Sequence, residues 1–174
     1  MEEKDIGKFI KKVEELKKSG SFDLSLDEDL SIAVMNLISL EEHFFFTAEK
    51  TKKEDDYLKL LDETRTLRKG LLAKMIPAHE GETWCISKHL LAATMRLMEV
   101  GTKLQTTGKP DEAKQMFRNA YKVYSLFWGL RLKLIDLSNV KKIPDGALNR
   151  KDKNPNGRMS FEDIVSKLVD CCDE

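Results

Sequence analysis

Residues 25–50 read SLDEDLSIAVMNLISLEEHFFFTAEK, and this stretch decides the fold. Its apolar side chains recur at intervals of three and four residues, which is the period of one face of an α-helix. Ser25 and Glu28 have the spacing of a capping box, so we expect the helix to begin there. The polar residues that follow Lys50 interrupt the pattern, so we expect the helix to end near that residue.

The same period predicts four further helices, separated by short turns. They are expected at about residues 3–18, 54–76, 83–106 and 110–137. Short connections make consecutive helices antiparallel neighbours, so we predict an all-α protein. Its architecture would be an up-down four-helix bundle with an additional N-terminal helix. Residues 1–140 would form one helical bundle domain. Residues 141–174 would form a loop-rich C-terminal extension that ends in a short helix from Phe161 and is not an independent domain.

Composition limits the class of partner. Among the 174 residues, 30 Lys and Arg balance 30 Asp and Glu, so the formal net charge is zero. This balance creates no global field that favours nucleic acid or an anionic membrane. No apolar run reaches the roughly 18 to 20 residues of a membrane span, and the N-terminus lacks an apolar signal segment. We therefore expect a cytoplasmic protein with no membrane or nucleic-acid partner.

Three charged residues fall in the middle of apolar helical faces: Glu41, Arg68 and Arg131. Burying an unpaired charge costs several kcal/mol, so each is expected to meet a partner charge, a ligand or water. At about 1.5 Å per residue, these residues and His89 fall in one half of the bundle. One interpretation is a structural network in which Glu41 pairs with Arg68 or Arg131. The other is a binding site, because two arginines leave one positive group that suits a carboxylate or phosphate.

Cys85 and His89 form a second pattern that bears on chemistry. They lie four residues apart and share a helical face, which suits two ligands of a transition metal or a thiolate assisted by a histidine. No third residue orients the pair, and neighbouring Lys88 would repel a cation. The alternative is a half-buried thiol beside a surface histidine. With an odd count of cysteines, Cys171 and Cys172 included, we expect reduced thiols.

The C-terminal loop at residues 152–163 reads DKNPNGRMSFED. It resembles a degenerate calcium loop of the EF-hand or dockerin type. The resemblance implies oxygen ligands from Asp152, Asn154, Asn156, Ser160 and Asp163. It also implies poor calcium affinity, because only two ligands are charged and Asp163 stands where EF-hands use a bidentate Glu. The alternative is a turn in which Ser160 and Asp163 begin the last helix as a cap.

Small residues recur along residues 97–121. Gly101, Gly108, Ala113 and Ala120 are interleaved with Phe117. This spacing resembles one helical hairpin of a tetratricopeptide repeat, in which small residues let two antiparallel helices approach closely. No second copy follows at a 34-residue period. The resemblance implies a tightly packed hairpin or, alternatively, a repeat-type peptide groove.

Aromatic and apolar side chains outside these motifs indicate packing. Phe44 and Phe45 are expected in the core, as are Tyr124, Phe127 and Trp128. Ile32, Met35 and Phe46 form a second apolar strip on the other side of the 25–50 helix. This strip is expected to receive the N-terminal helix or a second subunit.

Three hypotheses about function follow. The first is a non-enzymatic cytosolic binding protein that holds a small anionic ligand with Glu41, Arg68, His89 and Arg131. The second is a helical interaction or assembly module, with a protein partner or a second copy, whose inward charges are purely structural. The third is a metal-binding protein or an enzyme. The sequence contains no catalytic motif, so no catalytic residue and no cofactor are predicted.

Overall fold

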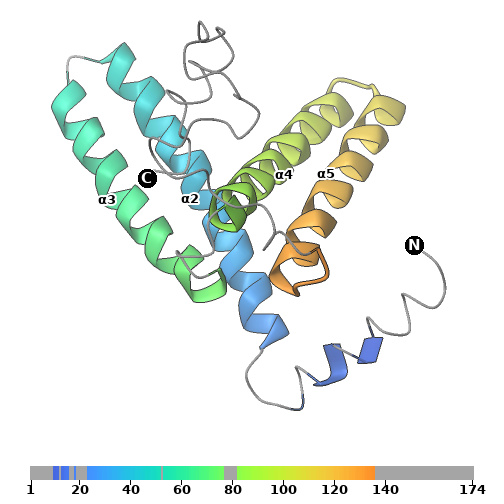
Figure 1. Cartoon of the computed structure of the whole chain (residues 1–174). Helices are drawn as coiled ribbons and strands as arrows, with labels where there is room; N and C mark the ends of the chain where they lie inside the picture. The colour runs from blue at the N-terminus through green and yellow to red at the C-terminus, as the bar shows by residue number, and fades with distance from the viewer. Residues whose placement is uncertain are drawn as a thin grey trace, which may run out of the picture.

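The computed structural model describes residues 23–51, 53–76 and 82–135, together with residues 10, 11, 13–15 and 18 near the N-terminus. Figure 1 shows the helices that dominate this part of the chain. They are α2 (Leu24–Lys50), α3 (Glu54–Met75), α4 (Glu82–Thr106) and α5 (Pro110–Arg131). The residues described near the N-terminus are helical too, and no strand occurs in any described range. The all-α prediction is confirmed.

The helices are arranged as two hairpins. In each hairpin two antiparallel helices pack along each other, α2 with α3 and α4 with α5, and the hairpins meet mainly through α2 and α4. From this contact the hairpins diverge, so that the α2–α3 turn and the α4–α5 turn lie at the separate ends of two arms (Figure 1). The up-down order expected of a bundle is present, with its halves splayed at one end. None of the described helices is long and apolar enough to cross a membrane.

The apolar core lies at the junction of the two hairpins. Val34, Leu72, Leu91 and Phe127 come from the four different helices and are fully buried there. Burying one such side chain stabilises the fold by about 1.5–3 kcal/mol. Ser31 adds a polar link across the junction, since its hydroxyl donates to the Glu28 carbonyl and lies 2.7 Å from the Tyr124 hydroxyl. The junction therefore holds the hairpins together.

The start of α2 differs from the prediction. The N-cap is Asp23, and its carboxylate accepts a hydrogen bond of 3.1 Å from the Leu26 backbone N–H. The helix begins at Leu24, so Ser25 is already inside it and the capping box predicted from Ser25 and Glu28 is wrong. A carboxylate at the N-terminus also interacts favourably with the helix dipole.

The end of α5 also differs, since the helix was expected to reach residue 137 and stops at Arg131. Lys133 has a φ of 54°, and the N–H groups of Lys133 and Leu134 bond to the carbonyls of Leu130 and Gly129 at 2.9 and 2.8 Å. This is the hydrogen-bond pattern of a Schellman motif. Ile135 folds back so closely that a Cβ on Gly129 would lie 2.8 Å from its Cδ1 atom. The apolar residues beyond Arg131 therefore belong to a turn and do not extend α5.

The α4–α5 hairpin is closely packed. A Cβ added to Gly101 would lie 2.7 Å from the Phe117 ring, so α4 and α5 approach at a distance that only glycine allows. Gly108 forms the turn with a φ of 77°, where glycine has no steric penalty. The tight hairpin predicted for residues 97–121 is present. The resemblance to a tetratricopeptide repeat itself stays a prediction.

Two predictions about apolar faces are wrong. Phe45 was placed in the core and is 47% exposed. Met35 was placed on an outer strip with Ile32 and Phe46, but it is buried and packs in the core. Met35 is buried because α2 packs against α4 as well as α3, so its buried surface is wider than one apolar stripe. The predicted C-terminal extension lies outside the described residues.

Candidate functional site

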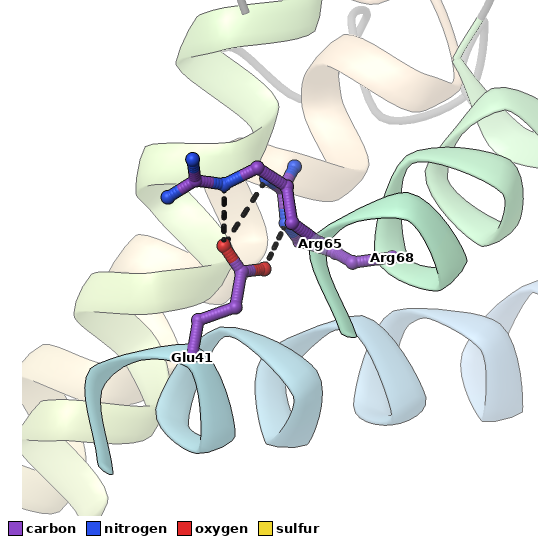
Figure 2. Close-up of polar contacts among 3 residues, drawn as sticks. All are labelled: Glu41, Arg65 and Arg68. Atoms are coloured by element: carbon purple, nitrogen blue, oxygen red, sulfur yellow. Dashed lines mark hydrogen bonds and ion pairs between the residues drawn. The ribbon is translucent and has the colours of Figure 1, made fainter. Parts of the chain in front are cut away.

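The candidate site is an ion cluster between α2 and α3. The Glu41 carboxylate accepts a hydrogen bond of 2.6 Å from Arg68 Nε on one oxygen and one of 3.1 Å from Arg65 Nε on the other (Figure 2). Arg68 Nη2 lies 3.5 Å from the second oxygen. The two arginines lie three residues apart, so they share a face of α3 and reach the same acceptor. Of the two partners expected for Glu41, Arg68 or Arg131, the structure shows Arg68.

Burial distinguishes the two arginines of this cluster. Arg68 is 1% exposed, whereas the side chain of Arg65 is 43% exposed. Arg65 uses its Nε atom for Glu41, so its two terminal nitrogens point away from the carboxylate (Figure 2). Neither terminal nitrogen bonds to another residue of the described ranges. The cluster carries two positive charges against one negative charge, and the exposed end belongs to Arg65.

The next residue along α2 takes part in a different cluster. Glu42 pairs with Arg96 on α4, and Arg96 pairs with Glu99 on its own helix. The three side chains are between 42% and 50% exposed, so water screens these pairs. This second cluster carries two negative charges against one positive charge. The six side chains of the two clusters carry three positive and three negative charges.

Arg131 does not join the Glu41 cluster, contrary to the predicted site. Its Nε donates to Asp27 Oδ2 at 2.7 Å, and the Asp27 side chain is 7% exposed. Asp27 precedes Glu41 by 14 residues, which is about 21 Å along α2. The Asp27–Arg131 pair joins the first turn of α2 to the last turn of α5, where both helix dipoles favour these charges. Its role in the described structure is to connect the hairpins.

His89 and Cys85 lie apart from both clusters. His89 is exposed and has no hydrogen bond or ion pair with another described residue. Cys85 is 2% exposed and belongs to the core, so the expectation of a half-buried thiol is wrong. Within the described ranges, no three His, Cys, Asp or Glu side chains converge as metal ligands do. The candidate calcium residues from Asp152 to Asp163 lie outside those ranges.

Sequence reasoning missed Arg65 and Asp27. Both had a positional signal: Arg65 precedes buried Leu72 by seven residues, and Asp27 precedes buried Val34 by seven. Seven residues are almost two helical turns, so each lies on a core-facing side. Each lies near the edge of an apolar face with other charged residues within three positions, so its pattern is also that of a surface charge.

Three large apolar side chains on α2, α3 and α4 are exposed. On α2, Glu41 faces α3 and Glu42 faces α4, so Phe45, one turn further on, points between the two helices. Leu58 precedes Arg65 by seven residues on α3 and is 40% exposed. Met98 follows fully buried Leu91 by seven residues on α4 and is 46% exposed.

Comparisons with known proteins do not identify a relative. No protein-family model matches the chain, and no curated protein or solved structure is significantly similar to it.

Proposed function

We propose that this chain is a cytoplasmic helical binding protein that holds a carboxylate-bearing ligand on Arg65. The observation that carries the proposal is the sharing of one carboxylate by two arginines, with the terminal nitrogens of the exposed arginine directed away from it. A guanidinium presents two parallel N–H donors on that side, which match the two oxygens of a carboxylate.

Each residue of the cluster has a distinct part in this proposal. Arg65 binds the ligand, and Glu41 orients Arg65 by accepting from its Nε atom. Arg68 keeps Glu41 in place from the buried side. A side chain held in its binding orientation loses less conformational entropy when the ligand arrives, which favours affinity.

Charge and surroundings indicate the class of ligand. Because the two neighbouring clusters are neutral together, a single carboxylate fits better than a dianionic phosphate. Phe45 is 47% exposed one turn beyond Glu41 on α2, which favours an apolar group next to that carboxylate. The ligand would therefore be an amphipathic carboxylate. A six-carbon fatty acid is a suitable probe, with an expected Kd on the order of 1 mM.

The test is a calorimetric titration of the full chain with hexanoate. We expect binding by the wild type, loss of binding in Arg65→Met and unchanged binding in Arg96→Met. Arg96 is a matched control because its side chain is 50% exposed and its terminal nitrogens already pair with glutamates. Hexanol tests the need for the carboxylate and inorganic phosphate tests the need for a single charge. If Arg65→Met and Arg96→Met bind hexanoate with equal affinity, the proposal is contradicted. It is also contradicted if the wild type binds hexanol as tightly as hexanoate.

Surface exposure supports a second candidate, the helical interaction module. Ile32 is 47% exposed and Phe46 is 48% exposed on the side of α2 that faces away from α3. If this surface mediates self-association, sedimentation equilibrium will show a concentration-dependent dimer that Phe46→Glu abolishes. A monomer at every concentration would exclude self-association through this surface.

A further inference from the structure

The two outermost helices, α3 and α5, carry opposite charge. Figure 1 shows α3 and α5 on the outer sides of the two hairpins, with α2 and α4 between them. Residues 54–63, at the start of α3, contain five acidic residues and one lysine. Residues 114–122 of α5 contain three basic residues and no acidic residue. The net charge of the chain is zero, so these two helices separate charge that balances over the whole sequence.

One side of α3 combines exposed leucines with carboxylates. Asp56, Leu60, Glu63 and Leu67 follow one another at intervals of four, three and four residues, so they lie along one side of the helix. All four are exposed, and the leucines are 42% and 56% exposed. Neither carboxylate forms a hydrogen bond or ion pair with another residue of the described ranges. We call these four residues the acidic stripe.

One side of α5 has the same spacing and the opposite charge. Lys114, Arg118, Tyr121 and Ser125 again follow at intervals of four, three and four residues, and all four are exposed. Tyr121 is 74% exposed, the largest value among the large apolar side chains that the structure describes. Lys114 pairs with Asp111 at 3.3 Å in a fully solvated position, whereas the Arg118 side chain has no partner within the described residues. We call these four residues the basic stripe.

The two stripes match in shape, polarity and charge. Side chains at intervals of three and four residues interdigitate when two helices pack along each other. Exposed aromatic side chains and arginines are the residue types enriched at the centres of protein interfaces. Opposite charges on the two surfaces favour their encounter and disfavour contact between two copies of the same stripe.

We propose that copies of this chain associate head to tail, with the acidic stripe of one copy packed on the basic stripe of the next. The leucines and Tyr121 form the apolar centre of the contact, and Glu63 and Arg118 supply the charge pair. Because the contact joins two different surfaces, each copy retains one free stripe, and assembly continues until a ring closes. Neither stripe includes Arg65 or Phe46, so this inference is independent of both candidate functions.

The first test is sedimentation equilibrium of the full chain. We expect self-association with a Kd on the order of 100 µM, weakened at high salt because the Debye length then falls to about 3 Å. Glu63→Arg and Arg118→Glu should each weaken it about tenfold. Lys103→Glu is the matched control, because Lys103 is exposed on α4 outside both stripes. A monomer up to about 1 mM would overturn the inference, as would a loss from only one stripe variant or an equal loss in the control.

Mixing the two stripe variants tests the head-to-tail arrangement directly. Glu63→Arg retains an intact basic stripe and Arg118→Glu retains an intact acidic stripe. Each variant alone should be monomeric where the wild type associates, and an equimolar mixture should associate again. A mixture of Glu63→Arg with Asp56→Lys, two variants of the acidic stripe, should stay monomeric. If the first mixture associates no more than its components, or the second associates as strongly as the first, the inference is overturned.

Discussion

At the scale of single residues, two adjacent glutamates have different surroundings. Glu41 is 9% exposed and pairs with a fully buried arginine, whereas the Glu42 side chain is 43% exposed and pairs with an exposed arginine. Removing one partner of a buried pair leaves the other charge uncompensated, while an exposed pair is replaced by water. The same substitution at neighbouring positions should therefore have very different effects.

We predict that Glu41→Gln lowers the free energy of unfolding by about 3 kcal/mol, because it strands the Arg68 guanidinium in the interior. Glu42→Gln should lower it by less than about 1 kcal/mol. Urea denaturation followed by circular dichroism measures both values. Similar losses in the two variants would show that the Glu41–Arg68 pair is not a buried interaction.

The sequence predicted that Glu41 pairs with Arg68 or Arg131, and it did not predict the rest of the cluster. Glu41 and Arg68 each lie in the centre of an apolar face, where a buried charge needs a partner, and this requirement brings them together. Arg131 satisfies the same requirement with Asp27, about 21 Å away along α2 from Glu41. Which of several possible partners an arginine takes depends on helix rotation and on the point where each helix ends. Periodicity alone does not define helix rotation, and it misplaced the end of α5 by six residues.

At the scale of the elements, helix positions follow from periodicity, but helix ends depend on local hydrogen bonds. The predicted bounds of α2, α3 and α4 differ from the structure by one residue at most. The predicted end of α5 is six residues too late, because Lys133 adopts a left-handed conformation that is uncommon for lysine and that the sequence pattern does not predict. A glycine at that position would have been a recognisable stop signal.

Glycines inside helices provide a matched pair of substitutions. Gly101→Ala should lower the free energy of unfolding by about 1–2 kcal/mol, because the clash with the Phe117 ring exceeds the gain in helix propensity. Gly70→Ala has open space around it and should raise the free energy of unfolding by about 0.5–1 kcal/mol. Thermal unfolding of both variants checks the opposite signs. A stabilised Gly101→Ala would mean that α4 and α5 are further apart than described.

The N-cap of α2 allows a second comparison. Asp23→Ala should cost about 1 kcal/mol, because the Leu26 N–H loses its acceptor. Ser25→Ala should be neutral or slightly stabilising, since Ser25 lies inside the helix and alanine is the better helix former. Chemical denaturation of the two variants distinguishes the two capping residues. A larger loss from Ser25→Ala would restore the capping box predicted from the sequence.

At the scale of the whole molecule, two hairpins share one core at their junction. The sequence predicts a bundle because each helix has one apolar side, but it does not predict that the hairpins diverge. The divergence depends on the crossing of α2 and α4, which is a property of both helices together. Phe45 is 47% exposed although its position in the pattern is that of a core residue.

Cys85 reports on the junction, because it is 2% exposed within the shared core. In a Cys171→Ser, Cys172→Ser background, we predict that Cys85 reacts with a thiol reagent about 1,000-fold more slowly than a free thiol, or slower still. The rate should increase with urea in proportion to global unfolding. Rapid labelling under native conditions would show instead that the hairpins separate without unfolding.

The central claim is that Arg65 is the carboxylate-binding group of this molecule. Its most direct test is the arginine side-chain region of the ¹H–¹⁵N NMR spectrum during titration with hexanoate, with each resonance assigned by substitution. The account predicts a saturable shift of the Arg65 resonances, a smaller shift of the Arg68 resonances through the shared Glu41 carboxylate, and no shift for Arg96. Shifts of equal size at Arg65 and Arg96, or none at Arg65 at saturating hexanoate, would contradict it.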